Sequence, residues 1–284
     1  MALFLLGGRF LKCRSDIKRV VTAFQPYCSS VVSGRKHVNG VDLYYEQTGR
    51  GKHALLLFPG ILGCSQITFL PQMKSLNKER FTLVNWDPRG YGRSCPPARD
   101  FPPDFFERDA KDGVDLMKAL GHDKFSVLGW CAGGITALIA AAKNPDLINQ
   151  LVVWGAMTFF SQQDLKVQQA LCDVSAWSPK LRDPLEEAYG AEGLVKNFAL
   201  WMDSAKEIAK RPGGNICREL LPLISCPTFI FHGEKDMFCP ITHSQFLLKH
   251  IKGSRLHLIP EARHSLHVTH ADEFNKLVED FLED

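Results

Sequence analysis

The sequence lacks the cysteine patterns that mark metal sites and disulfide frameworks. Its nine cysteines include no C-x-x-C pair and no zinc-type spacing, so we expect no bound metal. An odd, scattered set is also typical of free thiols in a reducing compartment rather than of disulfide-bonded domains. Most of these cysteines are therefore predicted to be small buried hydrophobic residues.

Long apolar runs are also lacking. No segment approaches the length of apolar chain needed to cross a bilayer, so we expect a soluble protein without a membrane partner. Acidic residues are scarce only at the start: residues 1–40 hold seven Lys or Arg against Asp16, a charge of +6 that leaves about −3 for the remainder. A mildly acidic body argues against a nucleic-acid partner.

Residues 1–36 are basic, contain several serines and show no globular pattern. These features are typical of a mitochondrial transit peptide. A secretory signal needs a longer apolar core than residues 2–6 offer, and a disordered basic tail is the other alternative. We therefore expect a mitochondrial protein, or otherwise a cytoplasmic one. Residues 37–284 are long enough for one sizeable core and predict a single, monomeric domain.

Short apolar runs alternate with helical patterns along this domain. Helical spacing occurs at 105–120 and 135–143. The predicted strands are 41–46, 54–58, 81–86, 124–128, 151–155, 228–233 and 256–259. This alternation predicts an α/β fold, with a mostly parallel sheet covered by helices on both faces.

The alternation stops between about residues 157 and 223. This interval contains helical segments punctuated by proline and glycine but no convincing strand. An insertion of this size after a strand's carboxyl end predicts a helical cap over the site. Its large side chains either line a pocket or form the cap's own small core. They are Trp177, Tyr189, Phe198, Trp201 and Met202.

One short motif carries the chemistry. Residues 129–134 read GWCAGG and join the strand at 124–128 to the helix at 135–143. A sharp strand-to-helix turn around one nucleophile is typical of the nucleophile elbow, usually written G-x-S-x-G. Gly129 and Gly133 then flank the turn because a Cβ there would collide with it. Cys131 stands where serine is expected.

An elbow nucleophile needs a base, and the base needs an orienting carboxylate. In this fold type the order along the chain is nucleophile, acid, histidine. The strands at 228–233 and 256–259 lead into loops that contain Asp236 and His264. Both loops leave the same edge of the sheet as the elbow. We therefore predict a triad of Cys131, Asp236 and His264.

Other acids and histidines near the triad are assigned structural roles. Glu234 is the alternative acid, but it lies nearer the strand than Asp236 does. His267 and His270 follow His264 at three-residue intervals on one helix face and are predicted to be surface or helix-start residues.

Two further histidines and two residues of a glycine-rich turn are also assigned structural roles. His232 and His257 lie inside predicted strands and are expected to be hydrogen-bonded core residues. Asp87 and Arg89 belong to the glycine-rich turn 87–94, and we expect them to hold that turn in place.

Acyl transfer also needs N–H donors aimed at the developing oxyanion. One is predicted to be the backbone N–H of Ala132, directly after the nucleophile. The other is expected in the loop after residues 59–60, where Leu62 is our choice and Ile61 the alternative.

Cysteine changes the energetics of the attack. The thiol's reference pKa of about 8.5 falls at helix starts and beside histidine, so thiolate forms near neutral pH. A thiolate suits esters, lactones and thioesters rather than unactivated amides. The prediction is thus a small-molecule ester hydrolase that needs no cofactor or metal. The alternatives are a non-catalytic ligand-binding protein and an acyltransferase in which water is a poor acceptor.

From about residue 38 to residue 282 the chain resembles the α/β-hydrolase family and, within it, the biphenyl-hydrolase-like proteins known as valacyclovir hydrolases. The resemblance rests on long motifs: VNGVDLYY, FPGILG, WDPRGYGRS, FPPDFFERDAKD, GITALIAAAK, HGEKD and GSRLHL. It implies a serine-type esterase of α-amino acid esters, including nucleoside prodrug esters, in mitochondria. Carried over by position, its triad falls on Cys131, Asp236 and His264.

Two departures from this resemblance concern the elbow itself. The family has Ser followed by Asp, and that Asp is understood to bind the α-ammonium group of the substrate. This chain has Cys131 followed by Ala132. Because a methyl group cannot pair with a cation, a neutral ester, lactone or thioester becomes the favoured substrate.

Overall fold

A computed structural model describes residues 31–170 and 172–283. Residues 1–30 of the predicted leader lie outside the described residues, so the mitochondrial location stays a prediction. Strand β1 (Val32–Val38) begins inside the segment 1–36 that we assigned to the leader. Its polar, mostly exposed side chains conceal an edge strand that pairs antiparallel with β2 from Val32 to Val38. The folded domain therefore includes residues that precede the expected start at 37.

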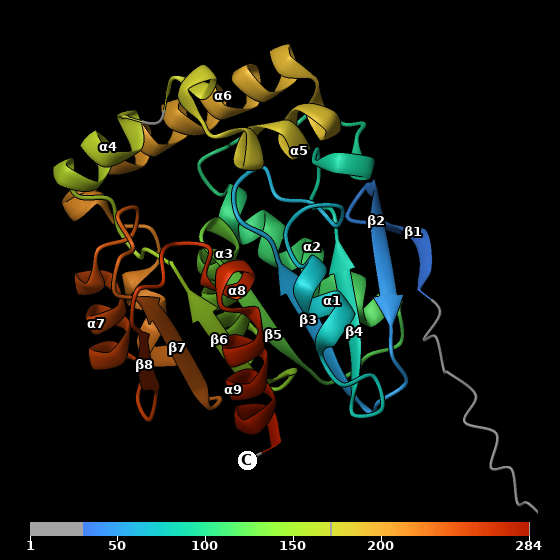
Figure 1. The fold of residues 1–284 in the computed structure, drawn as a ribbon. Helices are drawn as coiled ribbons and strands as arrows, with labels where there is room; N and C mark the ends of the chain where they lie inside the picture. Colours follow the sequence, from blue (N-terminus) through green and yellow to red (C-terminus); the bar gives the residue numbers. More distant parts are fainter. Residues whose placement is uncertain (1–30, 171, 284) are drawn as a thin grey trace, which may run out of the picture.

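Eight strands form one mixed, mostly parallel sheet (Figure 1). Their order is β1-β2-β4-β3-β5-β6-β7-β8; β1 and β2 pair antiparallel, β2 is antiparallel to β4, and all later neighbours are parallel. The remaining strands are β2 (Val41–Thr48), β3 (His53–Phe58), β4 (Phe81–Trp86), β5 (Phe125–Trp130), β6 (Ile148–Trp154), β7 (Thr228–Gly233) and β8 (Arg255–Ile259). The predicted α/β fold and its seven predicted strands are confirmed.

Helices cover both faces of the sheet and enclose two buried apolar clusters. The larger cluster lies beneath α2 (Phe105–Ala119), α3 (Ala132–Lys143) and α7 (Ile241–His250). The smaller lies beneath α1 (Leu70–Ser75), α8 (Leu266–Thr269) and α9 (Ala271–Glu283). Burial on two faces explains why the central strands are continuous apolar runs rather than alternating ones.

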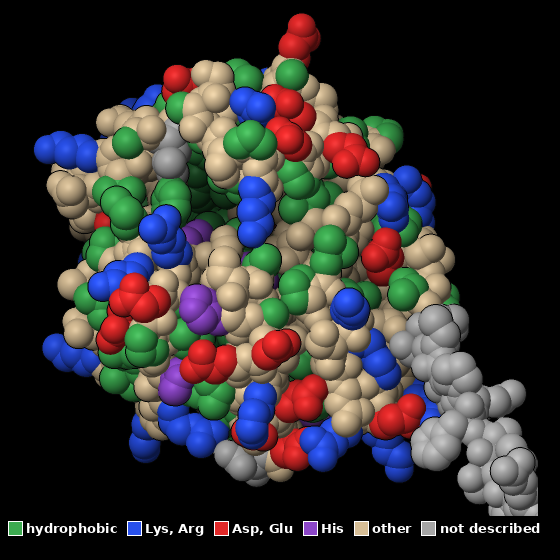
Figure 2. Space-filling model, in the orientation of Figure 1, with side chains coloured by type: hydrophobic (Ala, Val, Ile, Leu, Met, Phe, Trp, Pro, Cys, Tyr) green, Lys and Arg blue, Asp and Glu red, His purple; other side chains and the backbone are tan. Residues whose placement is uncertain are grey.

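The insertion between β6 and β7 lies over the carboxyl edge of the sheet (Figure 1). Its elements are α4 (Gln162–Gln169), η2 (Val174–Ala176), α5 (Pro179–Tyr189), α6 (Ala191–Ala209), η3 (Pro212–Gly214) and η4 (Arg218–Leu223). Figure 2 shows this side of the molecule hollowed below these helices, with hydrophobic side chains in the hollow. The hollow therefore opens above the strand ends, where loop residues from several strands meet.

The large aromatic side chains of the insertion have different roles. Trp201 is buried and packs against Phe101 and Phe105, with ring centroids 6.0 Å away in each case. Trp177 packs edge-on against Phe198 at 5.0 Å. The Trp177–Phe198 contact belongs to the cap's own core. The contacts of Trp201 pack the cap against the rest of the domain. No helix among the described residues is both long and apolar enough to cross a membrane.

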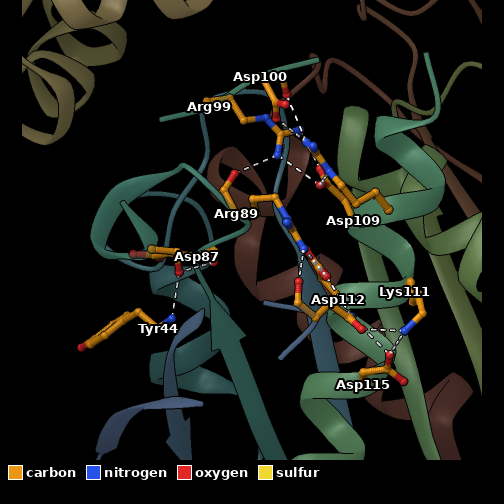
Figure 3. A network of polar contacts seen from close by, with 12 residues as sticks. Tyr44, Asp87, Arg89, Arg99, Asp100, Asp109, Lys111, Asp112 and Asp115 are labelled. Atoms are coloured by element: carbon orange, nitrogen blue, oxygen red, sulfur yellow. Dashed lines mark hydrogen bonds and ion pairs between the residues drawn. The ribbon is translucent and has the colours of Figure 1, made fainter. Parts of the chain in front are cut away.

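A network of ion pairs joins the loop after β4 to helix α2 (Figure 3). Arg89 donates to both oxygens of Asp112 at 2.9 Å and to the carbonyl of Asn39 at 3.2 Å. Asp87 accepts from the backbone N–H groups of Ser65 and Arg93 at 2.6 and 2.7 Å. Asp87 and Arg89 thus hold the turn, as we expected.

The Arg89–Asp112 pair predicts a specific loss of stability. Asp112 is almost fully buried and Arg89 mostly so, and removing one partner leaves the other charge unpaired. We expect Asp112→Ala to lower the free energy of unfolding by about 3 kcal/mol. The matched change Asp115→Ala, on the same helix but in an exposed pair with Lys111, costs less than about 1 kcal/mol. Urea denaturation measures both, and equal losses would contradict this role of the pair.

Candidate active site

The nucleophile candidate sits on a strained turn between β5 and α3. Cys131 has φ 56° and ψ −123°, a left-handed conformation that few residues other than glycine adopt. Its own N–H donates to the carbonyl of Trp154 on the neighbouring strand at 3.0 Å. The side chain is half-buried. The turn therefore projects one thiol upward from the carboxyl edge of the sheet, under the cap.

Glycine flanks this turn for steric reasons. A Cβ on Gly133 would stand 2.1 Å from the carbonyl oxygen of Phe58, and a Cβ on Gly129 would stand 2.6 Å from the carbonyl oxygen of Gly133. Both neighbours are backbone atoms, so neither clash can be relieved by a side-chain rotation. The missing Cβ of Gly133 lets the elbow approach the end of β3, and the missing Cβ of Gly129 lets β5 pack against the start of α3.

Two loops bring a histidine and a carboxylate to the elbow. His264 follows β8, and its Nδ1 lies 2.8 Å from Oδ2 of Asp236, which follows β7. The other oxygen of Asp236 accepts from the N–H groups of Phe238 and Cys239 at 2.8 and 3.0 Å. Trp130 donates its indole N–H to the carbonyl of His264 at 3.0 Å. His264 is thus held both through its ring and through its backbone carbonyl.

The same contacts set the charge of Asp236. Burial by itself raises the pKa of this carboxyl, but the hydrogen bond and positive charge of His264 outweigh burial, together with the two backbone N–H donors. The pKa of Asp236 is therefore lowered, and the carboxylate is ionised at neutral pH.

Cys131 and His264 form a coupled pair. Burial raises the pKa of the thiol, yet the charge and hydrogen bond of His264 lower it below the ordinary thiol value, with help from the backbone N–H groups of Ala132 and Ile61. Burial likewise lowers the pKa of His264, but Cys131 and Asp236 raise it to about 10. Each of the two groups therefore favours the charged form of the other.

The backbone N–H groups that face the Cys131 sulfur differ in one residue from the oxyanion donors that we chose first. Ala132 and Ile61 direct their N–H groups at the sulfur. Leu62 instead turns into a left-handed conformation, φ 59°, and its carbonyl accepts from the Tyr189 hydroxyl of the cap at 2.9 Å. The geometry favours Ala132 together with Ile61, our alternative to Leu62, as the donor pair, and this assignment stays a prediction.

Two other histidines also differ from expectation. His267 is fully buried rather than superficial, and its Nδ1 accepts from the indole N–H of Trp154 at 3.1 Å. Burial lowers the pKa of His267 to about 3, so this ring is neutral. His257 is half-exposed near Glu273 rather than in the core.

The other histidines and the acid that we considered as alternatives lie outside the triad. His232 is buried with its Nδ1 3.1 Å from the Ser244 hydroxyl. His270 is only half-buried at the end of α8, and Glu234 is exposed. Within residues 31–170 and 172–283, no cluster of three or more His, Cys, Asp or Glu is arranged to hold a metal.

Sequence reasoning missed the role of Tyr189. Tyr189 is the last residue of α5, and its hydroxyl donates to the carbonyl of Leu62 in the loop after β3. A tyrosine in a helical insertion carries no sequence signal for such a contact, because the fold of the cap decides where the side chain points. Chemically, the arrangement places a thiol beside an imidazole that a carboxylate orients, with two backbone N–H groups facing the sulfur. These are the kinds of group that acyl transfer requires.

Several known proteins are similar to this chain. A family model described as alpha/beta hydrolase fold matches residues 53–188. Serine hydrolase BPHL of Mus musculus is 58% identical over 255 residues, covering 90% of this chain and 88% of that protein. The Homo sapiens protein of the same name is 56% identical with the same coverage. In fold, the chain is similar to the meta-cleavage product hydrolase CumD of Pseudomonas fluorescens IP01, with TM-score 0.72, 20% identity, and 88% and 97% coverage.

The paired charges predict how the cysteines react with iodoacetamide. Because the pKa of Cys131 is lowered, we expect its alkylation near neutral pH to be faster than that of the exposed Cys95. Buried Cys64, whose pKa burial raises to about 12, should stay unmodified. Peptide mass spectrometry at a series of pH values measures each rate.

A matched pair of variants isolates the histidine in this experiment. His264→Ala should slow Cys131 alkylation at pH 6 by at least about 10-fold, because the thiolate loses its counter-ion. His270→Ala should leave the rate unchanged. A Cys131 rate that His264→Ala does not alter would show that the two groups are uncoupled.

Proposed function

The chain belongs to the α/β-hydrolase family, beside serine hydrolase BPHL, and is a hydrolase; on that premise we propose that it cleaves small carboxylic esters through an acyl-enzyme on Cys131. The observation that carries the proposal is the chain of contacts from the Cys131 sulfur to His264 and from His264 to Asp236 at 2.8 Å. The relatives are named serine hydrolases, whereas this elbow carries a thiol.

The first half of the reaction forms the acyl-enzyme. The Cys131 thiolate attacks the carbonyl carbon, a sulfur–carbon bond forms, and the carbonyl electrons move onto oxygen. Backbone N–H groups of Ile61 and Ala132 stabilise that oxyanion. As the oxyanion collapses, the carbon–oxygen bond to the leaving group breaks, and the His264 imidazolium donates its proton to the departing alkoxide. An alcohol leaves and a thioester stays on Cys131.

The second half consumes water. His264, now neutral, accepts a proton from water as the oxygen attacks the thioester carbon. The second oxyanion collapses with cleavage of the sulfur–carbon bond, and the carboxylic acid leaves. The products are one acid and one alcohol, and the thiolate–imidazolium pair is restored. Asp236 stays ionised throughout and keeps the ring oriented.

Substrate charge follows from the residue after the nucleophile. Ala132 presents a methyl group, which offers no partner for an α-ammonium group. We therefore assign neutral esters, lactones or thioesters as the preferred substrates, rather than α-amino acid esters. Burying an unpaired ammonium at this position would be costly.

Variants of Cys131 test the proposed nucleophile. With p-nitrophenyl acetate we expect acetyl mass on the Cys131 peptide and steady release of nitrophenol. Cys131→Ala should give no adduct and lose at least about 10³-fold in kcat, because the attacking group is gone. Cys131→Ser should retain or improve ester turnover, since an alkoxide leaving group competes better against serine than against thiolate. Acylation elsewhere, with an unchanged rate in Cys131→Ala, would refute the assignment.

Variants of Ala132 test the proposed substrate charge. A carboxylate at this position would stand beside the acyl group, so Ala132→Asp should raise the kcat/KM ratio of valyl to pentanoyl p-nitrophenyl ester by about 10-fold or more. The neutral control Ala132→Asn, of similar size, should leave the ratio close to its parent value. A parent enzyme that already prefers the valyl ester would contradict the proposed preference for neutral substrates.

A further inference from the structure

The loop that carries the Ile61 N–H is a strained turn. Gly63 donates its own N–H to the carbonyl of Gly60 at 2.9 Å, which places Ile61 and Leu62 at the two central positions of the turn. Leu62 has φ 59°, a left-handed conformation that favours glycine at this position. A leucine there costs conformational energy, so contacts from outside the turn are needed to hold its shape.

Tyr189 of the cap supplies such a contact. Helix α5 lies above the carboxyl ends of β3 and β4 (Figure 1), and the Tyr189 hydroxyl donates to the carbonyl of Leu62 at 2.9 Å. Leu62 directly follows the residue whose N–H faces the Cys131 sulfur. The backbone N–H of Gly92, in the glycine-rich turn after β4, faces the same hydroxyl. One hydroxyl thus joins the cap to the loops after two neighbouring strands.

The Tyr189 side chain is itself fixed in place. It is the last residue of α5, and Gly190 then turns the chain with φ 69°. The Tyr189 ring packs edge-on against Tyr91, with ring centroids 6.2 Å apart. Burial raises the pKa of Tyr189, so the phenol keeps its proton and donates it to Leu62 at neutral pH.

The loop after β3 is held from two directions. Beyond the turn, the N–H of Ser65 donates to Asp87 at 2.6 Å, and both residues belong to the domain beneath the cap. At Leu62 the anchor comes from the cap instead. The contacts that set the charges of the triad, by contrast, all come from outside the cap. A displacement of α5 would therefore release the turn and leave the triad as it is.

We propose that Tyr189 is a positioning residue for acyl transfer: through its hydrogen bond to Leu62, the cap holds the Ile61 N–H where the oxyanion forms. The inference rests on the proposed function, in which Ile61 is an oxyanion donor. It adds that the rate of acylation depends on the position of the cap, whereas the intrinsic reactivity of the ionised thiol does not.

Two reactions of the same sulfur separate these effects. Acylation of Cys131 by p-nitrophenyl acetate passes through an oxyanion, and nitrophenol release in a single turnover measures its rate. Alkylation by iodoacetamide is a displacement, in which a sulfur–carbon bond forms, a carbon–iodine bond breaks and no oxyanion develops. Both rates are measured over a series of pH values. Their limits at high pH are compared, because the thiol is fully ionised there and a change in its pKa has no effect.

Three variants of the full chain carry the test. Tyr189→Phe keeps the ring and removes the hydroxyl, so its limiting acylation rate should fall about 5- to 10-fold, the effect of one hydrogen bond. Its limiting alkylation rate should not change. Tyr189→Leu also removes the ring contact with Tyr91 and should slow acylation at least as much. The control Tyr45→Phe, on β2, should alter neither rate.

The contrary outcomes are distinct. If Tyr189→Phe acylates as fast as the parent protein, the hydrogen bond does not position the donor and the inference falls, even where Tyr189→Leu is slow. Equal losses of acylation and alkylation in Tyr189→Phe would also overturn it, because the sulfur itself would then be displaced. In both cases acetylation of Cys131 in the parent protein leaves the proposed esterase function standing. If p-nitrophenyl acetate does not acylate Cys131 in the parent protein, both proposals fail.

Discussion

The whole site depends on the pairing of one sulfur with one imidazole across a strained turn. Cys131 adopts a left-handed backbone conformation, which costs conformational energy for a residue with a Cβ. The turn is retained because Gly129 and Gly133 let backbone pack against backbone and because the Cys131 N–H is bonded to Trp154. In return the thiol faces His264, and each group favours the charged form of the other. Without that turn the thiol would be one more buried cysteine with a raised pKa, like Cys64 or Cys217.

The rest of the fold serves to hold this pair. Parallel strands end on one edge of the sheet, so loops after β3, β5, β7 and β8 converge although they are far apart in sequence. Asp236 is fixed by two backbone donors before it meets His264, so its position does not depend on the substrate. Asp87 holds the loop that follows Ile61 through the N–H of Ser65, and the cap holds the same loop from above through Tyr189. Oxyanion donors are effective only when they are positioned in advance, and these contacts provide that positioning.

Much of this arrangement could be predicted from sequence, for identifiable reasons. The apolar runs locate the central strands, and the chain order of nucleophile, acid and histidine selects Cys131, Asp236 and His264, which the structure brings together. Other features depend on tertiary packing. Leu62 adopts a left-handed conformation, and the N–H that faces the sulfur is that of Ile61. The burial of His267 under Trp154 follows from the docking of a four-residue helix. The polar residues of β1 make this edge strand hard to recognise in the sequence.

The central claim is that His264 carries a positive charge because Cys131 carries a negative one. Nuclear magnetic resonance of the histidine rings, with nitrogen-15 labelling, distinguishes a doubly protonated imidazolium from either neutral tautomer. At pH 7.5 the account predicts that both ring nitrogens of His264 are protonated in the parent protein and that the ring titrates near its raised pKa of about 10. In Cys131→Ala the ring should lose its second proton at a lower pH. A neutral His264 ring at pH 7.5 in the parent protein would contradict the account.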